Sequence, residues 1–142
     1  MEAVHGTCVA IGECALLVHG PPGSGKSDLL VRLAEQSARL VADDWVLLNG
    51  DQGNLHAFAQ AALAGKVELR GISVLTVLFV RTVRLVMVVD LVSGTAVPRL
   101  PAPATCTYEG VVLAVLALAP FETSTPAKLR LAPAHAPAHA PA

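Results

Sequence analysis

Residues 16–30 read LLVHGPPGSGKSDLL and contain an ungapped G-x-x-x-x-G-K-S motif, formed by Gly20, Gly25, Lys26 and Ser27. An apolar run precedes the motif, and the leucines that follow it recur at helical spacing. A strand, a glycine-rich loop and a helix in this order make up the phosphate-binding loop, or Walker A motif, of nucleotide-binding domains. The stretch therefore predicts an α/β fold in which a strand and a helix enclose a phosphate site.

Each part of this loop has a physical role in binding a phosphate chain. Glycines allow several backbone N–H groups to converge on phosphate oxygens, and the N-terminus of the helix behind them favours anions. Lys26 supplies positive charge for the terminal phosphates, and the Ser27 hydroxyl is suited to Mg2+. We therefore expect a nucleotide and its metal at Gly20, Pro21, Pro22, Gly23, Ser24, Gly25, Lys26 and Ser27.

The composition limits the other functions that the chain can have. With 142 residues it is long enough for one domain with a single sizeable core. Hydrophobic residues make up 54% and aromatic residues 4%, so we expect a core of Val, Leu and Ala around a buried sheet. A net charge of −1 without a basic stripe argues against nucleic-acid binding. The apolar runs are too short to span a membrane, and the start of the sequence lacks the basic region of a signal peptide. The three cysteines show no metal-binding spacing, so we expect reduced cysteines in a cytoplasmic protein.

The apolar runs predict a mixed sheet of short strands. Residues 7–11 and 15–19 predict a hairpin whose second strand leads directly into the glycine loop. The other expected elements are helices at 27–36, 60–64 and 127–131, a turn at 49–54, and strands at 39–42, 45–48, 67–69, 74–80, 83–89 and 111–118.

The chain ends in the low-complexity segment APAHAPAHAPA, residues 132–142. Alternating proline and alanine cannot build a core, so we expect a disordered or polyproline-like tail. His135 and His139 are interpreted as solvated tail residues rather than as a metal site, because no rigid element is expected to present them. The chain is therefore divided into a folded domain at residues 1–131 and a tail at residues 132–142.

Two acidic positions compete for roles near the phosphates. The stretch LVADDW places Asp43 and Asp44 at the end of a strand-like run, and RLVMVVD ends in Asp90. Phosphoryl transfer uses one acidic group near the metal and another that accepts the proton of the nucleophile. Paired carboxylates can divide these roles, whereas a strand that ends in one aspartate is the pattern that holds Mg2+ in many ATPases. Spacing alone leaves both options open, and a solvated Asp-Asp turn is a further alternative.

Two other positions carry groups suited to this chemistry. In VELRG, Glu68 and Arg70 are two residues apart, so on a strand their side chains face the same way. A carboxylate beside a guanidinium suits Mg2+ and phosphate respectively, although an exposed ion pair explains the pattern equally well. His5 is a lone histidine near the start, and such a residue is more often structural than catalytic.

The order of these pieces resembles the C-terminal kinase domain of HPr kinase/phosphorylase. The resemblance is carried by VHG at His5, the glycine loop, ADDW and VELRG, and it extends to about Arg130. It is nearest to the short alphaproteobacterial members without an N-terminal domain, whose late segments are similar to VVDLVSGTAVPRLP and LALAPFETSTPAKLR. The family implies a single P-loop α/β domain whose nucleotide core resembles that of phosphoenolpyruvate carboxykinase.

The resemblance also implies a role for each matching residue. Asp44 corresponds to the family's proton acceptor, so the resemblance favours Asp44 over Asp90. His5 matches the histidine of the VHG motif, and Ser73 stands where the family usually has a second glycine. The implied catalytic residues are His5, Lys26, Asp44 and Arg99, the implied metal ligands are Ser27, Glu68 and Asp43, and Arg70 with Gly71 forms the substrate loop.

Members of this family use ATP to phosphorylate a serine of the phosphocarrier protein HPr, a component of the phosphotransferase system, and reverse the reaction by phosphorolysis. The resemblance therefore implies an ATP- and Mg2+-dependent protein-serine kinase that acts on an HPr-like carrier. Because the long members are hexamers, it also implies a homo-oligomer. Two alternatives are a P-loop kinase of a small molecule, which needs a lid that the sequence lacks, and a non-catalytic nucleotide sensor, which has no need of Asp44.

Overall fold

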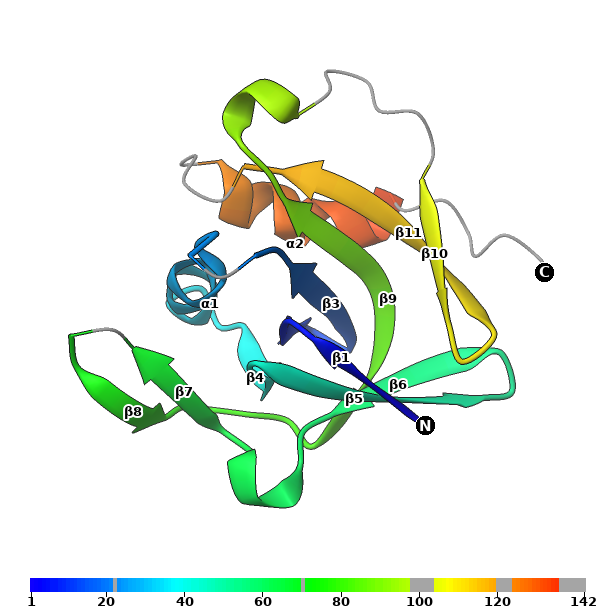
Figure 1. Ribbon diagram of the computed structural model, residues 1–142, viewed down its shortest axis with the longest axis horizontal. Coiled ribbons are helices and arrows are strands. Elements are labelled where there is room, and N and C mark those ends of the chain that lie inside the picture. Colours follow the sequence, from blue (N-terminus) through cyan, green and yellow to red (C-terminus); the bar gives the residue numbers. More distant parts are fainter. Residues whose placement is uncertain (22, 70, 98–103, 120–123, 136–142) are drawn as a thin grey trace.

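The computed structural model describes residues 1–21, 23–69, 71–97, 104–119 and 124–135. The strands in these ranges form a nine-stranded sheet and a separate two-stranded sheet (Figure 1). The large sheet contains β1 (Glu2–His5), β2 (Thr7–Ile11), β3 (Cys14–His19), β4 (Arg39–Ala42), β5 (Trp45–Asp51), β6 (Asn54–Phe58), β9 (Thr82–Leu91), β10 (Thr105–Tyr108) and β11 (Val111–Leu118). The other elements are β7 (Lys66–Leu69) and β8 (Ser73–Thr76), the helices α1 (Lys26–Ala34) and α2 (Thr125–His135), and the 3-10 turns η1 (Ala61–Leu63) and η2 (Gly94–Ala96).

The large sheet is mixed, as the sequence predicts. Its strand order is β1-β5-β6-β9-β3-β2-β4, and β11 pairs with both β9 and β10. The pairs β3–β9 and β9–β11 are parallel, whereas the other neighbouring pairs are antiparallel. β9 is long enough to pair with β6 through its first residues and with β11 through its last ones. The longest strand therefore connects the hairpin β5–β6 to the parallel centre of the sheet.

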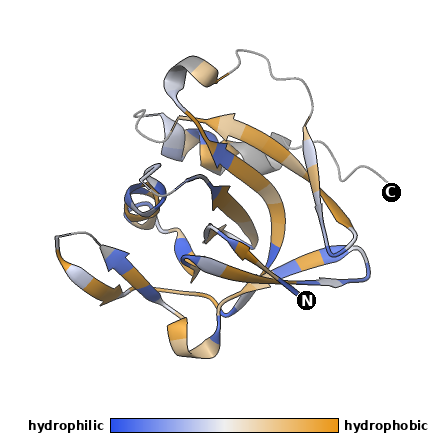
Figure 2. Cartoon of the chain, viewed as in Figure 1, coloured by the Kyte–Doolittle hydropathy of each residue, from blue (hydrophilic) through white to orange (hydrophobic). Residues whose placement is uncertain are grey.

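The apolar runs are continuous because both faces of the central strands are buried. On β2, Val9 packs in a core that also contains Leu29 and Leu33 of α1 and Leu129 of α2. Its neighbour Cys8 points to the other face, where a second core is enclosed by the curled sheet. Figure 1 shows this curl, and Figure 2 shows hydrophobic residues along β3, β9 and β11. Two cores thus hold β3 rigidly on both sides, directly before the glycine loop.

The predicted hairpin at residues 7–19 and the helix after the loop are confirmed as β2, β3 and α1. The turn predicted at residues 49–54 is too long, because Asn49 and Gly50 pair with His56 and Leu55 across the β5–β6 hairpin. The turn is limited to two residues with positive φ, Gln52 and Gly53, which matches the twist of a two-residue hairpin. The strands β1, β6 and β10 were not predicted.

The last helix extends further than the sequence predicts. α2 continues to His135, four residues into the segment expected to be a tail. Intrinsic propensity does not explain this extension, because Pro133 in the added turn disfavours a helix more strongly than Ala132 and Ala134 favour one. His139 and the rest of residues 136–142 lie outside the described residues. Neither described helix is long and apolar enough to cross a lipid bilayer.

Candidate active site

Three strands bring the predicted site residues to one edge of the sheet. β2 runs antiparallel to both β3 and β4, so β3 and β4 end at the same edge, and β9 ends there too because it is parallel to β3. The glycine loop follows His19 at the end of β3, Asp43 follows β4, and Asp90 lies near the end of β9. Ligands of α/β domains bind outside the carboxyl ends of such strands. This edge is therefore the candidate active site.

The glycine loop connects β3 to α1 through a tight turn. The backbone N–H of Ser24 donates to the carbonyl oxygen of Pro21 at 3.0 Å, and Gly25 caps the helix with a φ of 100°. A Cβ at Gly20 would lie 2.6 Å from Ser24 Oγ, so a side chain there would force the Ser24 hydroxyl to move. Gly25 has the clearer requirement, because its positive φ favours glycine.

Two polar groups of the loop fit an anion. Lys26 Nζ donates to the carbonyl oxygens of Gly20 at 2.6 Å and of Pro21 at 3.1 Å, which holds its ammonium group against the loop. Ser24 Oγ is buried without a hydrogen-bond partner among the described residues. Phosphate oxygens would accept hydrogen bonds from both groups, and buried polar atoms need such partners. The loop residues present therefore suit a nucleotide phosphate, while Pro22 lies outside the described residues.

Asp43 is half-buried and held by a buried hydroxyl. Thr7 Oγ1 donates to Asp43 Oδ1 at 2.8 Å, and Thr7 itself is buried at the start of β2. Desolvation by burial raises the pKa of Asp43, although the Thr7 hydrogen bond, the Asp44 backbone N–H and the nearby Lys26 ammonium each oppose the shift. Asp43 therefore lies within electrostatic reach of the glycine loop. The sequence analysis did not identify Thr7. The one indication of its role in the sequence is that it is a polar residue at the start of an otherwise apolar strand.

Asp44 pairs with His5 at the surface. Nε2 of His5 lies 2.8 Å from Oδ1 of Asp44, and the Asp44 side chain is 71% exposed. The Trp45 backbone N–H donates to the Asp43 carbonyl at 2.9 Å, and Asp44 between them has a φ of 70°. This is a γ-turn with a positive central φ, a rare and strained conformation. The turn directs the Asp44 carboxylate outward, where a second substrate can reach it.

The position directly after His5 is occupied by a glycine, Gly6, whose surroundings leave little room for a side chain. Its backbone N–H donates to the Asp44 carbonyl at 3.0 Å, which joins the start of β2 to the strained turn. A Cβ at this position would lie 2.8 Å from the carbonyl oxygen of Val18 on β3. Because that oxygen belongs to a buried strand, it has little freedom to move away. The glycine therefore lets the junction of β1 and β2 approach β3 closely, directly after His5.

Asp90 has a partner of its own. His19 and Asp90 are register partners on the parallel strands β3 and β9, and His19 Nδ1 lies 3.5 Å from Asp90 Oδ1. Both side chains are about half exposed, and His19 directly precedes the glycine loop. The structure thus brings Asp90 to the same edge as Asp44, and the assignment of the proton acceptor to Asp44 stays a prediction.

The predicted residues Glu68 and Gly71 lie on a separate hairpin. β7 and β8 project from the large sheet beside η1 (Figure 1), and Val67 anchors β7 in the core that α1 covers. Glu68 and Gly71 are exposed, and among the described residues no three His, Cys, Asp or Glu side chains are close enough to hold a metal together. Glu68 as a metal ligand therefore stays a prediction. Arg70 and Arg99 lie outside the described residues.

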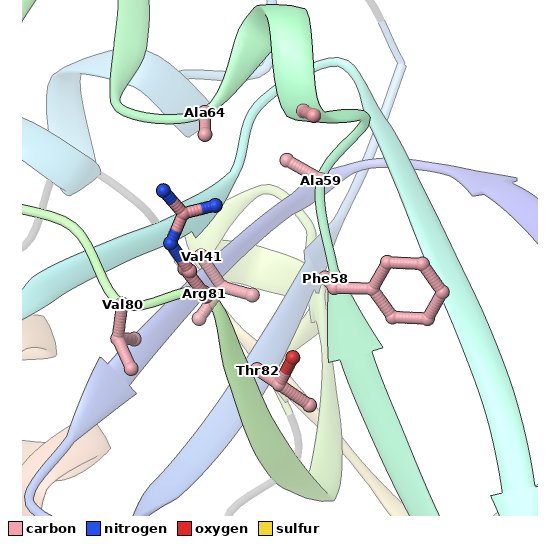
Figure 3. Close-up of a pocket in the computed structure, with 8 residues that line it drawn as sticks. Val41, Phe58, Ala59, Ala64, Val80, Arg81 and Thr82 are labelled. Atoms are coloured by element: carbon pink, nitrogen blue, oxygen red, sulfur yellow. The ribbon is translucent and has the colours of Figure 1, made fainter.

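A small pocket lies away from this edge. It has a volume of about 200 Å3 and is lined by residues of β4, β6, η1 and the start of β9. Figure 3 shows Val41, Phe58 and Arg81 around it, and none of the predicted site residues is among those that line it. Lys26, Asp43, Asp44 and Asp90 thus lie at the edge of the sheet and do not line this pocket.

Comparison with known proteins places the chain in a family. The profile described as HPr Serine kinase C-terminal domain matches residues 1–93, which include the glycine loop, the Asp43-Asp44 turn and Glu68. The chain belongs to this family. The resemblance seen in the sequence is thereby confirmed.

Individual relatives agree with this assignment. HPr kinase/phosphorylase from Bacillus subtilis is 35% identical over 77 residues, and that from Lactiplantibacillus plantarum is 36% identical over 78 residues. Each match covers 54% of this chain but 25% of the relative, so the chain spans about a quarter of the length of these curated relatives. The solved structure of the Hpr(Ser) kinase/phosphatase from Coxiella burnetii matches with a TM-score of 0.81 at 19% identity, over 92% of each chain. That likeness confirms the α/β fold with its mixed sheet.

Proposed function

We propose that this chain transfers the γ-phosphoryl group of ATP to a serine hydroxyl of an HPr-like phosphocarrier protein. Membership of the HPr serine kinase family supports the reaction type. The observation that carries the proposal is the 2.8 Å contact between His5 Nε2 and the exposed Asp44 carboxylate, at the edge where the glycine loop begins. A proton acceptor that is accessible from solvent beside a phosphate site is the arrangement that phosphorylation of a second protein requires.

The glycine loop holds the donor in this proposal. Backbone N–H groups of residues 23–27 bind the phosphates, and Lys26 exchanges its carbonyl partners for phosphate oxygens. We assign Mg2+ to Ser27, Asp43 and Glu68, and the ion when bound would neutralise charge on the phosphoryl oxygens. Because Mg2+ commonly keeps several waters and substrate oxygens as ligands, it does not need three protein carboxylates.

Asp44 acts on the acceptor. Its carboxylate takes the proton of the serine hydroxyl while the serine oxygen bonds to the γ-phosphorus and the bond to the ADP oxygen breaks. His5 holds this carboxylate in place through the 2.8 Å contact. In the reverse reaction, inorganic phosphate takes the phosphoryl group from the phosphoserine to give pyrophosphate. The protonated Asp44 then returns its proton to the serine oxygen.

The accessible Asp44 also bears on the class of acceptor. A kinase of a small molecule encloses its acceptor in a pocket, whereas the pocket described above contains no predicted site residue. A protein acceptor brings its own surface to an open site. We further propose that Arg70, Gly71 and Arg99 contact the substrates, that the nucleotide core is like that of phosphoenolpyruvate carboxykinase, and that the protein is a cytoplasmic homo-oligomer.

The test is a transfer assay with purified full-length protein, γ-labelled ATP, Mg2+ and an HPr-like carrier. The expected result is label on a carrier serine, with no label on a carrier whose acceptor serine is replaced by alanine. Incubation of the phosphorylated carrier with inorganic phosphate tests the reverse reaction in the same preparation. Tight ATP binding without transfer to the carrier would contradict the proposal and favour a nucleotide sensor.

A further inference from the structure

Trp45 is a large apolar side chain in an exposed position. It is the single tryptophan of the chain, it begins β5 directly after Asp44, and it is 50% exposed. A scattered exposed apolar residue is ordinary on a protein surface. The position of this one is not ordinary, because it adjoins the residue proposed to accept the proton of the substrate.

The backbone fixes where the indole ring lies. His5 and Trp45 are register partners on the antiparallel strands β1 and β5, so their side chains are directly opposite each other. Their rings meet edge to face, with centroids 5.3 Å apart and an interplanar angle of 89°. The hydrogen bond from the Trp45 N–H to the Asp43 carbonyl fixes the start of β5. The indole is therefore held beside the His5–Asp44 pair while half of its surface stays open to solvent.

From this placement we infer that Trp45 is the docking residue for an apolar side chain that flanks the acceptor serine of the carrier protein. The inference rests on the function proposed above and specifies what the carrier presents to this site. Tryptophan is enriched among the residues that dominate binding energy at protein interfaces, because a large rigid ring buries much area at little entropic cost. A serine that enters toward Asp44 brings its sequence neighbours within reach of the indole.

The charge around Trp45 favours an apolar partner over a cationic one. A lysine or arginine on the indole face would lie close to the Asp44 carboxylate and pair with it, so it would compete with the serine hydroxyl for the carboxylate oxygens. An apolar side chain on the indole instead removes water from the surroundings of the carboxylate. Exclusion of water strengthens the electrostatic interactions of the site and limits hydrolysis of ATP. The contact therefore serves binding and transfer together.

The first test uses Trp45 as its own reporter, since no other tryptophan contributes fluorescence. The full-length protein is titrated with a tryptophan-free carrier, and emission and acrylamide quenching are recorded. The expected result is a blue shift and weaker quenching that saturate with carrier, and both changes should be lost when the apolar residues flanking the acceptor serine are replaced by serine. Unchanged emission and quenching at carrier concentrations that support phosphorylation would overturn the inference.

The second test separates docking from support of His5. Trp45→Ala is expected to raise the KM for the carrier roughly tenfold or more, with the KM for ATP unchanged, and Trp45→Phe should restore most of the loss. Leu131→Ala on α2, which also removes an exposed apolar side chain, should change neither constant. If Trp45→Ala lowers kcat at an unchanged carrier KM, the residue merely positions His5 and the docking role is wrong. If the wild-type protein phosphorylates no carrier, the proposed function fails and this inference fails with it.

Discussion

His5 and Asp44 are 39 positions apart in numbering, yet Nε2 of His5 lies 2.8 Å from Oδ1 of Asp44. Their contact depends on the pairing of β1 with β5, which brings the first strand alongside the segment that follows the Asp43-Asp44 turn. Gly6 strengthens the junction by donating its N–H to the Asp44 carbonyl. The pair is thus a product of tertiary pairing, and each residue depends on the other for its place at the site.

Replacement of Asp44 by asparagine tests its role as proton acceptor. Asp44→Asn keeps the size of the side chain, and asparagine tolerates the positive φ of this turn. Because the amide cannot accept the serine proton, we expect kcat for carrier phosphorylation to fall roughly 10²- to 10⁴-fold. The Kd for ATP should stay within about twofold.

The matched control for this change is Asp51→Asn, which removes an exposed aspartate at the other end of β5. It should leave kcat unchanged. The same measurement on Asp90→Asn decides between the two acidic positions, since both lie at the same edge of the sheet. If Asp90→Asn abolishes transfer while Asp44→Asn does not, the assignment of the proton acceptor is wrong.

Replacement of Lys26 tests the loop as the nucleotide site. Lys26→Met removes the ammonium that now bonds the carbonyls of Gly20 and Pro21. A hydrogen bond to a charged group contributes about 1.5–3 kcal/mol, so the Kd for ATP should rise roughly ten- to hundredfold. Isothermal titration calorimetry measures this directly, with Lys128→Met on α2 as the control. Equal ATP affinity in both variants would mean that the nucleotide binds elsewhere.

Much of the fold could be predicted because its signals are local. The glycine loop fixes β3 and α1 in sequence order, and the apolar runs mark β2, β9 and β11. The strands β1, β6 and β10 escaped prediction because they are short and partly exposed, so their residues show no continuous apolar run. Their pairing partners, and not their own propensities, make them strands.

The residues of the candidate site also differ in whether local sequence or strand pairing reveals them. Motifs make Lys26, Asp43 and Asp44 candidates because their residue types suit phosphate and metal chemistry, and the resemblance to the family favours Asp44 over Asp90. Thr7 and Trp45 are different, because their importance arises from a hydrogen bond to Asp43 and a ring contact with His5 across strands far apart in the sequence. A single sequence has no signal for such contacts until the register of β1, β2 and β5 is known.

The half-buried carboxylate of Asp43 predicts how stability depends on pH. Desolvation raises the pKa of Asp43 in the folded protein above its ordinary value, so the folded state binds a proton more readily than the unfolded state. The unfavourable contribution of Asp43 is therefore absent below its ordinary pKa of about 3.8. It appears as pH rises from that value through the raised pKa of the folded state.

Asp43→Asn should consequently increase the free energy of unfolding at neutral pH in metal-free buffer. Asparagine Oδ1 still accepts the hydrogen bond that Thr7 donates, so the change mainly removes a desolvated charge. The difference from wild type should shrink as pH falls toward the ordinary pKa of the carboxyl group. Urea unfolding across this pH range measures it, and a variant less stable than wild type at neutral pH would contradict the prediction.

The packing of Gly6 against β3 predicts a combined loss of stability and activity. In Gly6→Ala the new Cβ would lie 2.8 Å from the Val18 carbonyl oxygen, so β1 or β3 must shift. We expect the free energy of unfolding to fall by about 1–3 kcal/mol, as for other overpacked sites. Because Gly6 also bonds Asp44, the shift should separate His5 from Asp44 and lower kcat at temperatures where the variant remains folded.

Gly12→Ala is the control for the loss of kcat expected in Gly6→Ala. Gly12 has a φ of 65° in the β2–β3 turn, and nothing lies within 4 Å of an added Cβ, so the substitution adds backbone strain without a clash. It should reduce stability by roughly 1–2 kcal/mol and leave kcat unchanged. If the two variants lose equal stability and equal activity, the loss in Gly6→Ala reflects general destabilisation. A fall in kcat confined to Gly6→Ala instead shows that the close approach of Gly6 to β3 positions His5 for catalysis.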